Sequence, residues 1–156
     1  MTQPKPQVLL LTNDLTEASL ISMVLKASNI DVSMVFSDLE MISALDIALP
    51  DLILADWDKE GMNGRAIVTA MRTVAIGVKT VPSILMTDRT LNEVSRINLA
   101  VDGFRWVLEK PVVVTSLPKL IQHTLIESWN VKQHARQTQF VHFGDTASSA
   151  LMESVR

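Results

Sequence analysis

Asp56 stands where an apolar run gives way to a polar loop, and a carboxylate in such a place can do chemistry. The run before it, Leu52–Ala55, does not alternate polar with apolar residues, so both of its faces should be buried, as in the middle of a parallel sheet. The stretch from Asp56 to Gly64 reads DWDKEGMNG and has the polar and glycine content of a functional loop. Asp56 is therefore expected at the end of a buried strand, at the edge of the sheet.

Polar side chains also follow three other apolar runs that we predict to be strands. Asn13 and Asp14 follow the first strand. Thr87 ends the fourth strand, and Lys110 follows the fifth. Ligands of open α/β sheets bind beyond the carboxyl ends of the strands, so these groups and Asp56 are expected to converge on one edge.

Two carboxylates, an amide, a hydroxyl and an ammonium group suit phosphoryl transfer. Carboxylate oxygens are hard ligands for Mg²⁺, and a carboxylate can also be the nucleophile that becomes an acyl phosphate. A lysine would neutralise charge on the transferred group, and a hydroxyl would hydrogen-bond to one of its oxygens. The chain has no GxxxxGKS/T and no GxGxxG loop, so we expect the phosphoryl donor to be a phosphoprotein or a small acyl phosphate, not ATP bound here.

Strand-like runs alternate with helical patterns along the chain, which predicts βαβ units. Right-handed crossovers between parallel strands then favour a doubly wound α/β sandwich with helices on both faces of a five-stranded sheet. The predicted strands are Val8–Thr12, Val32–Phe36, Leu52–Ala55, Ser83–Thr87 and Phe104–Leu108.

Apolar residues at helical spacing predict a helix after each strand. Asp14 or Thr16 can cap the first helix, Pro50 stops the second, and the third begins near Arg65. The residues expected to face inward are Leu15, Ala18, Ile21 or Ser22 and Leu25 in the first helix, Met41, Ile42, Leu45 and Leu49 in the second, and Ile67, Val68 and Met71 in the third.

The last two predicted helices carry recognisable start signals. Thr90 and Glu93 have the spacing of a capping box for the fourth. Ser116 can cap the fifth, with Pro118 in its first turn. The inward residues are then Val94, Ile97 and Val101 in the fourth helix, and Leu117, Leu120, Ile121, Leu125 and Ile126 in the fifth.

Length and composition bound the function classes. A chain of 156 residues is expected to form one domain. The net charge is -3 and the basic residues do not form a run, so nothing indicates nucleic acid binding. The chain has no cysteine, which excludes disulfides, thiolate zinc sites and a catalytic thiol. No signal peptide and no membrane-spanning stretch is evident, so a soluble, cytoplasmic protein is expected.

The chain resembles a bacterial response-regulator receiver domain over roughly residues 7–129. Four motifs carry the resemblance: LLLTND at Leu9–Asp14, DLILADWDKEGMNG at Asp51–Gly64, PSILMT at Pro82–Thr87, and EKP ending at Pro111. Each motif is weak alone, but together in this order and spacing they are specific. The resemblance implies a flavodoxin-like sheet with strand order 2-1-3-4-5.

The resemblance also implies roles for the residues at the sheet edge. Asp56 would be the phospho-acceptor. Mg²⁺ would be bound by Asp14, by Asp56 and by the backbone carbonyl of Asp58, with Asn13 acting through a water. Thr87 would be the switch hydroxyl, and Lys110 would pair with the phosphoryl group, followed by a cis bond to Pro111.

By the same resemblance the chain takes part in two-component signalling. A histidine kinase or a histidine phosphotransfer protein would pass its phosphoryl group to Asp56. Beyond accepting this group and autodephosphorylation, the protein would not be an enzyme. Output would be protein–protein interaction through the face of the fourth helix, fifth strand and fifth helix, on which Arg105 and Val107 are expected.

Three residues depart from the family pattern. Asn13 stands where the family has one of a pair of acids, which predicts weaker Mg²⁺ binding. Asp88 follows Thr87 where a small residue is usual; it either supports the start of the fourth helix or crowds the acceptor. Val107 takes the place of the aromatic switch residue, and Trp106 should point to the opposite face. These departures motivate an alternative, an interaction module that is not switched by phosphate.

Residues 130–156 are expected to form an extension, since 27 residues are too few for a separate output domain. Val131–Gln139 can continue the fifth helix, and Asp145 can cap a short amphipathic helix after it. The apolar residues of this tail must pack on something if ordered. Docking on its own domain, a homodimer and a partner protein all remain open. Trp57 is expected to pack beside the site, and the histidines lack partners at metal-ligand spacing: His123, His134 and His142.

Overall fold

The computed structural model describes residues 4–59, 62–74, 80–90 and 104–145. Within them, five strands pair in parallel in the order β2-β1-β3-β6-β7. This is the flavodoxin-like order predicted from the sequence. A short antiparallel hairpin, which was not predicted, lies in the loop after β3. The strands are β1 Gln7–Leu11, β2 Asp31–Val35, β3 Leu52–Asp56, β6 Ser83–Thr87 and β7 Phe104–Glu109, with β4 Asp58–Lys59 and β5 Met62–Asn63 in the hairpin.

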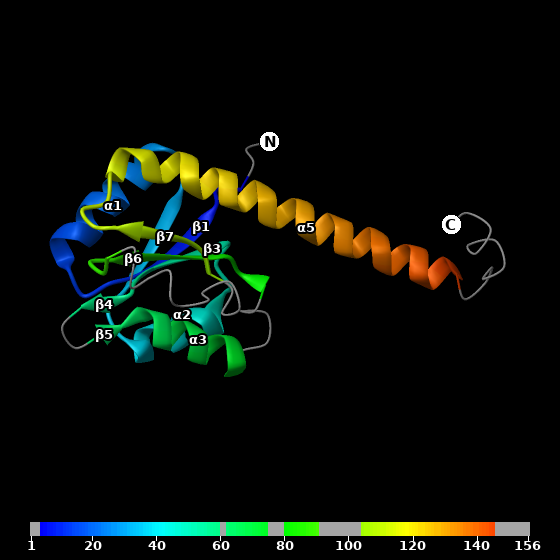
Figure 1. Ribbon diagram of the computed structural model, residues 1–156, viewed down its shortest axis with the longest axis horizontal. Helices are drawn as coiled ribbons and strands as arrows, with labels where there is room; N and C mark the ends of the chain where they lie inside the picture. Colours follow the sequence, from blue (N-terminus) through cyan, green and yellow to red (C-terminus); the bar gives the residue numbers. More distant parts are fainter. Residues whose placement is uncertain (1–3, 60–61, 75–79, 91–103, 146–156) are drawn as a thin grey trace.

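Helices cover both faces of the sheet (Figure 1). Helices α1 and α5 lie on one face, and α2 and α3 lie on the other. The expected fourth helix, with Thr90 and Glu93 as its capping box and Val94, Ile97 and Val101 facing inward, falls mostly on residues outside the described ranges. The bounds are α1 Leu15–Ala27, α2 Asp38–Ile47, α3 Gly64–Val74 and α5 Leu117–Asp145, with a 3-10 turn η2 at Val114–Ser116.

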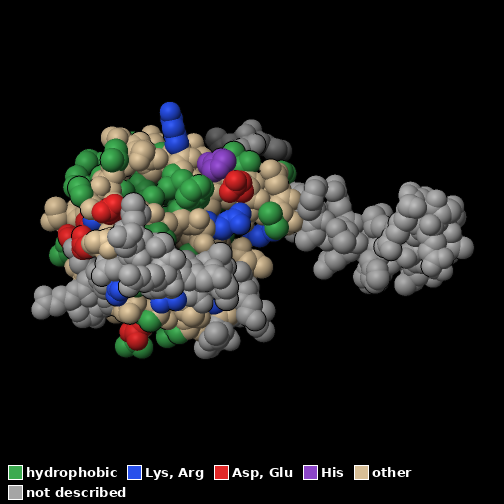
Figure 2. Space-filling model, in the orientation of Figure 1, with side chains coloured by type: hydrophobic (Ala, Val, Ile, Leu, Met, Phe, Trp, Pro, Cys, Tyr) green, Lys and Arg blue, Asp and Glu red, His purple; other side chains and the backbone are tan. Residues whose placement is uncertain are grey.

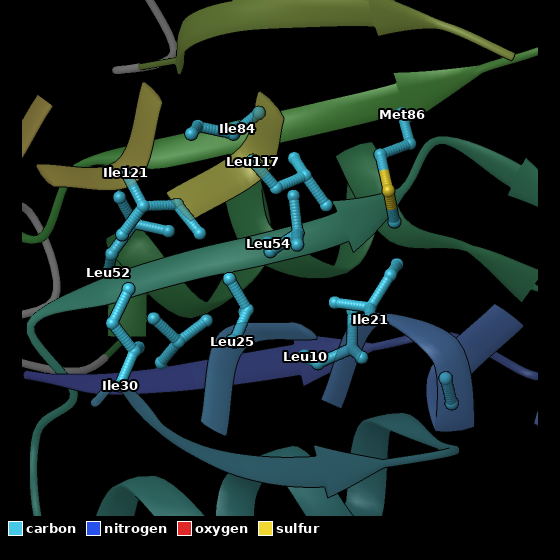
Figure 3. Close-up of a cluster of buried hydrophobic side chains, with 12 residues drawn as sticks. Leu10, Ile21, Leu25, Ile30, Leu52, Leu54, Ile84, Met86, Leu117 and Ile121 are labelled. Atoms are coloured by element: carbon cyan, nitrogen blue, oxygen red, sulfur yellow. The ribbon is translucent and has the colours of Figure 1, made fainter. Parts of the chain in front are cut away.

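The core is built on the apolar strands, as their sequences predict. All five residues of β3 are buried, because helices cover both of its faces. Figure 3 shows the cluster on the α1/α5 face, where Leu52 and Leu54 of β3 meet Ile21 of α1 and Ile121 of α5. A second cluster on the α2/α3 face includes Leu9, Leu11, Ile53, Met41 and Val68.

Side chains cap the first three helices. The Asp14 carboxylate accepts a hydrogen bond from the Glu17 backbone N–H at 3.1 Å, so Asp14, of the two candidates, caps α1. Ser37 caps α2 in the same way, through the N–H of Glu40. Asn63 Oδ1 accepts from the N–H of Ala66 at 3.1 Å and so holds the start of α3.

Four residues expected to face inward are instead exposed. Leu15, the first residue of α1, is 68% exposed. Ile126 is 61% exposed, because it lies five positions after the buried Ile121 and so turns away from the sheet. Ile42 and Leu49 are also exposed, because α2 buries only Met41 fully and ends before Leu49. The helix α5 runs from Leu117 to Asp145. The expected short helix after Asp145 lies outside the described residues.

The strand β7 pairs irregularly with β6 near its start and presents side chains to both faces of the sheet. The pairing register with β6 shifts between Ser83 and Ile84. Trp106 donates from Nε1 to Thr124 Oγ1 of α5 at 3.1 Å, whereas Val107 packs against the cluster on the α2/α3 face. The two residues therefore point to opposite faces, as predicted. Arg105 is exposed and lies 3.9 Å from Glu127 of α5.

Candidate functional site

Asp56 is completely buried at the carboxyl end of β3. Its Oδ1 lies 2.5 Å from Nζ of Lys110, and its Oδ2 accepts a hydrogen bond from the hydroxyl of Thr12. Lys110 is itself only 8% exposed and follows the end of β7. Burial of a carboxylate is costly unless it is paired and hydrogen-bonded, and here both of its oxygens have partners.

A second carboxylate, that of Glu17, reaches the same lysine. Glu17 Oε2 lies 3.2 Å from Lys110 Nζ, and its side chain, in the first turn of α1, is 24% exposed. Burial raises the pKa of the Glu17 carboxyl above its ordinary value, and the negative charge of Asp56 raises it further, while Lys110 partly opposes both effects. One ammonium group is thus shared by two carboxylates.

Thr87 and Lys110 are brought to the same edge by the pairing of β6 with β7. The backbone N–H of Lys110 donates to the carbonyl of Thr87 at 2.8 Å. Thr87 is buried, and its hydroxyl oxygen accepts from the N–H of Arg89 at 2.9 Å. The peptide bond between Lys110 and Pro111 is cis, as expected. Asp88 is exposed where the chain leaves β6.

The residues predicted to bind Mg²⁺ are placed less favourably. Asp14 uses its carboxylate as the cap of α1, and Asn13 is exposed. Asp58 lies in the hairpin, paired with Asn63. The residue whose side chain points at Asp56 from the end of β1 is Thr12, one position earlier than the pair that the sequence suggested.

These positions do not make a ready divalent-cation site. Among residues 4–59, 62–74, 80–90 and 104–145, no three His, Cys, Asp or Glu side chains come together in a way that could hold a metal ion. Mg²⁺ requires oxygen ligands in near-octahedral geometry. A carboxylate that is already paired with other groups must give up those contacts before it can bind the ion. Asp56 already holds Lys110 and Thr12, so the described side chains do not fit a strong Mg²⁺ site.

Replacing Thr12 with aspartate is expected to make stability depend on a divalent cation. The new carboxylate would be buried beside Asp56, and two like charges repel at such a distance. The melting temperature should fall in EDTA and recover on addition of Mg²⁺, because a ligand at 100 times its Kd returns about 2.7 kcal/mol.

Differential scanning fluorimetry with and without Mg²⁺ measures this effect. Thr12→Asn is the matched control, since it adds a similar volume without the charge and should show no recovery. An equal response of the parent protein to Mg²⁺ would show that the native residues already form a metal site.

Trp57 is buried next to Asp56, and two guanidinium groups lie over its ring. It is 2% exposed. The guanidinium of Arg89 lies 4.8 Å from the ring centroid, and that of Arg65 lies 5.5 Å from it. Two positive groups therefore stand next to the strand end that bears Asp56. His123, by contrast, is exposed and pairs with Glu127 within α5; the side chains of His134 and His142 are outside the described part.

Sequence reasoning missed Thr12 and Glu17, and of the two only Glu17 left a signal in the sequence. Thr12 follows β1 and stands opposite Asp56 because Leu11 pairs with Ala55, a register that the sequence does not show. Glu17 follows the cap of α1 by three positions, which is the spacing of a capping box and places its side chain at the start of the helix.

Solved structures show what fold this is. A sensor protein from Polaromonas sp. JS666 has a TM-score of 0.71 with 17% sequence identity, over 80% of this chain and 99% of that chain. A CheY-like response regulator receiver domain protein from Methanospirillum hungatei JF-1 has a TM-score of 0.70 with 17% identity, over 81% and 98%. The chemotaxis protein CheY4 of Vibrio cholerae has a TM-score of 0.69 with 22% identity, over 77% and 98%.

At these identities the likeness shows the fold, and the chain has the fold of CheY-like receiver domains. No family model matches the sequence, and no curated protein matches it. Within the described residues, no helix has the length and apolar character needed to cross a bilayer. On the face shown in Figure 2, the coloured Lys and Arg side chains are dispersed among acidic and apolar ones.

Proposed function

We propose that this chain is a signalling module of the receiver type, in which Asp56 accepts a phosphoryl group from a histidine kinase or a histidine phosphotransfer protein. One observation carries the proposal: Asp56, at the end of the central strand, is paired at 2.5 Å with a buried lysine from the end of β7. The fold that it shares with receiver domains supports the same function.

The proposed transfer is a substitution at phosphorus. A carboxylate oxygen of Asp56 forms a bond to phosphorus as the bond from phosphorus to the donor histidine nitrogen breaks, and the electron pair of that bond leaves with the histidine. Lys110 would neutralise charge on the phosphoryl oxygens, and the Thr87 hydroxyl would hydrogen-bond to one of them. Because both Asp56 oxygens are engaged, the reacting one must first give up Thr12 or Lys110.

Mg²⁺ is the proposed cofactor. The ligands would be Asp14, Asp56 and the carbonyl of Asp58, with Asn13 through a water. When bound, the ion would supply positive charge for the phosphoryl oxygens. Since the described side chains do not form a strong cation site, we expect millimolar Mg²⁺ to be needed.

Replacing Asp56 with asparagine is expected to abolish phosphorylation. The parent protein, incubated with acetyl phosphate and Mg²⁺, should gain the mass of one phosphoryl group in intact mass spectrometry, whereas Asp56→Asn should gain none. An amide is not a nucleophile of this kind. Asp51→Asn, which removes an exposed carboxylate just before the start of the same strand, is the control and should behave as the parent. An unmodified parent protein would refute the proposal.

A second candidate function is an interaction module that works without phosphate. It is favoured by the complete burial of Asp56 and by Thr12, a neutral residue whose hydroxyl hydrogen-bonds to the acceptor carboxylate. Under this function a partner would bind equally to the parent protein and to Asp56→Asn. A pull-down with the two proteins, with and without acetyl phosphate, therefore separates the two functions.

Signalling output would be a change in affinity for a downstream protein. The exposed Arg105 of β7 and Glu127 of α5 belong to the face proposed for this contact. The helix α5, which extends beyond the sheet in Figure 1, is the other proposed contact and could also mediate a homodimer. We propose no nucleic-acid or membrane partner and no enzymatic activity beyond accepting and losing the phosphoryl group, with the cytoplasm as the location.

A further inference from the structure

Glu17 and Asp56 share one buried cation. Lys110 Nζ lies 2.5 Å from Asp56 Oδ1 and 3.2 Å from Glu17 Oε2. The Lys110 side chain is 8% exposed, so it has little water to replace either contact. The second oxygen of Glu17 is buried without a hydrogen-bond partner. Glu17 therefore lies in the site itself rather than on its rim.

A phosphoryl group on Asp56 would need the lysine that Glu17 holds. A phosphorylated side chain carries about -1.5 to -2 charges, here in place of the single charge of the Asp56 carboxylate. Charge-assisted contacts to a cation are the strong ones. Glu17 would then face this added charge at short range, where like charges repel. The contact of Glu17 with Lys110 and the repulsion between Glu17 and the phosphoryl group both disfavour the phosphorylated form of Asp56.

We infer that Glu17 is a built-in competitor of the phosphoryl group for Lys110, and that it restrains phosphorylation of Asp56. The inference rests on the proposed function of Asp56. Two features make the competition reversible. The Glu17 side chain is 24% exposed, so it can turn out to solvent. Its backbone N–H is fixed by Asp14, so α1 need not unwind when the side chain leaves.

Beryllofluoride, a mimic of the phosphoryl group, tests the competition in the full chain. Its affinity is measured in the presence of Mg²⁺ by fluorine NMR for the parent protein and for Glu17→Gln, Glu17→Asp and Asp38→Asn. Glu17→Asp keeps the charge on a shorter side chain that reaches less far toward Lys110. Asp38→Asn removes an exposed charge from the first turn of α2 and is the matched control. Binding of Mg²⁺ alone is measured for the same proteins.

We expect Glu17→Gln to bind beryllofluoride about tenfold more tightly than the parent, which corresponds to one pKa unit of electrostatic interaction. Glu17→Asp should lie between them, and Asp38→Asn should match the parent because exposed distant charges are screened. Equal or weaker binding by Glu17→Gln would overturn the inference, and weaker binding of Mg²⁺ alone would make Glu17 a metal ligand instead. If no protein of the series binds, the proposed function fails and the competition fails with it.

Discussion

Replacing Lys110 with methionine is expected to lower the free energy of unfolding by about 3–5 kcal/mol, the usual cost of breaking a buried ion pair by removing one partner. Methionine keeps much of the apolar volume of the lysine stem but leaves Asp56, which is fully buried, without its counter-charge. The loss is made worse by Glu17, because two carboxylates would then face each other with no cation between them. Urea denaturation followed by circular dichroism measures the change.

The second substitution, Asp56→Asn, identifies the cause. In the double variant Asp56→Asn/Lys110→Met the uncompensated charge is gone, so the protein should recover more than half of the stability that Lys110→Met loses. Lys119→Met is the matched control, since Lys119 is exposed on α5, and it should change stability by less than about 0.5 kcal/mol. A double variant whose loss equals the sum of the two single losses would show that the pair is not coupled.

The fold could be predicted because the strands of this chain carry their own signal. The run of Leu52, Ile53 and Leu54 places apolar side chains on both faces of its strand. Only a central strand covered by helices on both sides buries such a run. The alternation of these runs with helical patterns then leaves few topologies. The exposure of Ile126 could not be predicted in this way, because helical spacing alone does not tell which of two neighbouring apolar residues faces the sheet.

The site could be predicted only in part, for a geometric reason. The proximity of Asp56 and Lys110 could be predicted because Asp56 ends β3 and Lys110 follows β7, and the carboxyl ends of parallel strands meet at one edge. Whether Thr12, Asn13 or Asp14 points at Asp56 depends on a register of one residue, since neighbouring strand side chains point to opposite faces. Glu17 was missed because it comes from a helix, and its direction depends on how α1 docks on the sheet.

Gly64 packs directly against the backbone of Asp56, and its replacement by alanine is expected to be strongly destabilising. The backbone N–H of Gly64 donates to the carbonyl of Trp57 at 2.8 Å, which draws the start of α3 against the end of β3. A Cβ atom on Gly64 would stand 1.9 Å from the backbone carbonyl oxygen of Asp56 and 3.3 Å from the Cβ of Ala55. Backbone atoms cannot rotate away as the end of a side chain can.

Two opposing effects decide whether Gly64→Ala raises or lowers the stability of the protein. Alanine gains about 1 kcal/mol over glycine in a helix interior, and less at the first residue of α3. Relief of the clash requires α3 or the end of β3 to move, and overpacking of this kind costs about 1–3 kcal/mol or more. The clash should therefore win, with a melting temperature lower by several degrees. Ser19→Ala, at an exposed position of α1, should leave it nearly unchanged. The carbonyl of Asp56 must move with the end of β3, so Gly64→Ala should also slow phosphorylation by acetyl phosphate. A Gly64→Ala variant as stable and as reactive as the parent would show that the close approach of Gly64 to Asp56 is not needed.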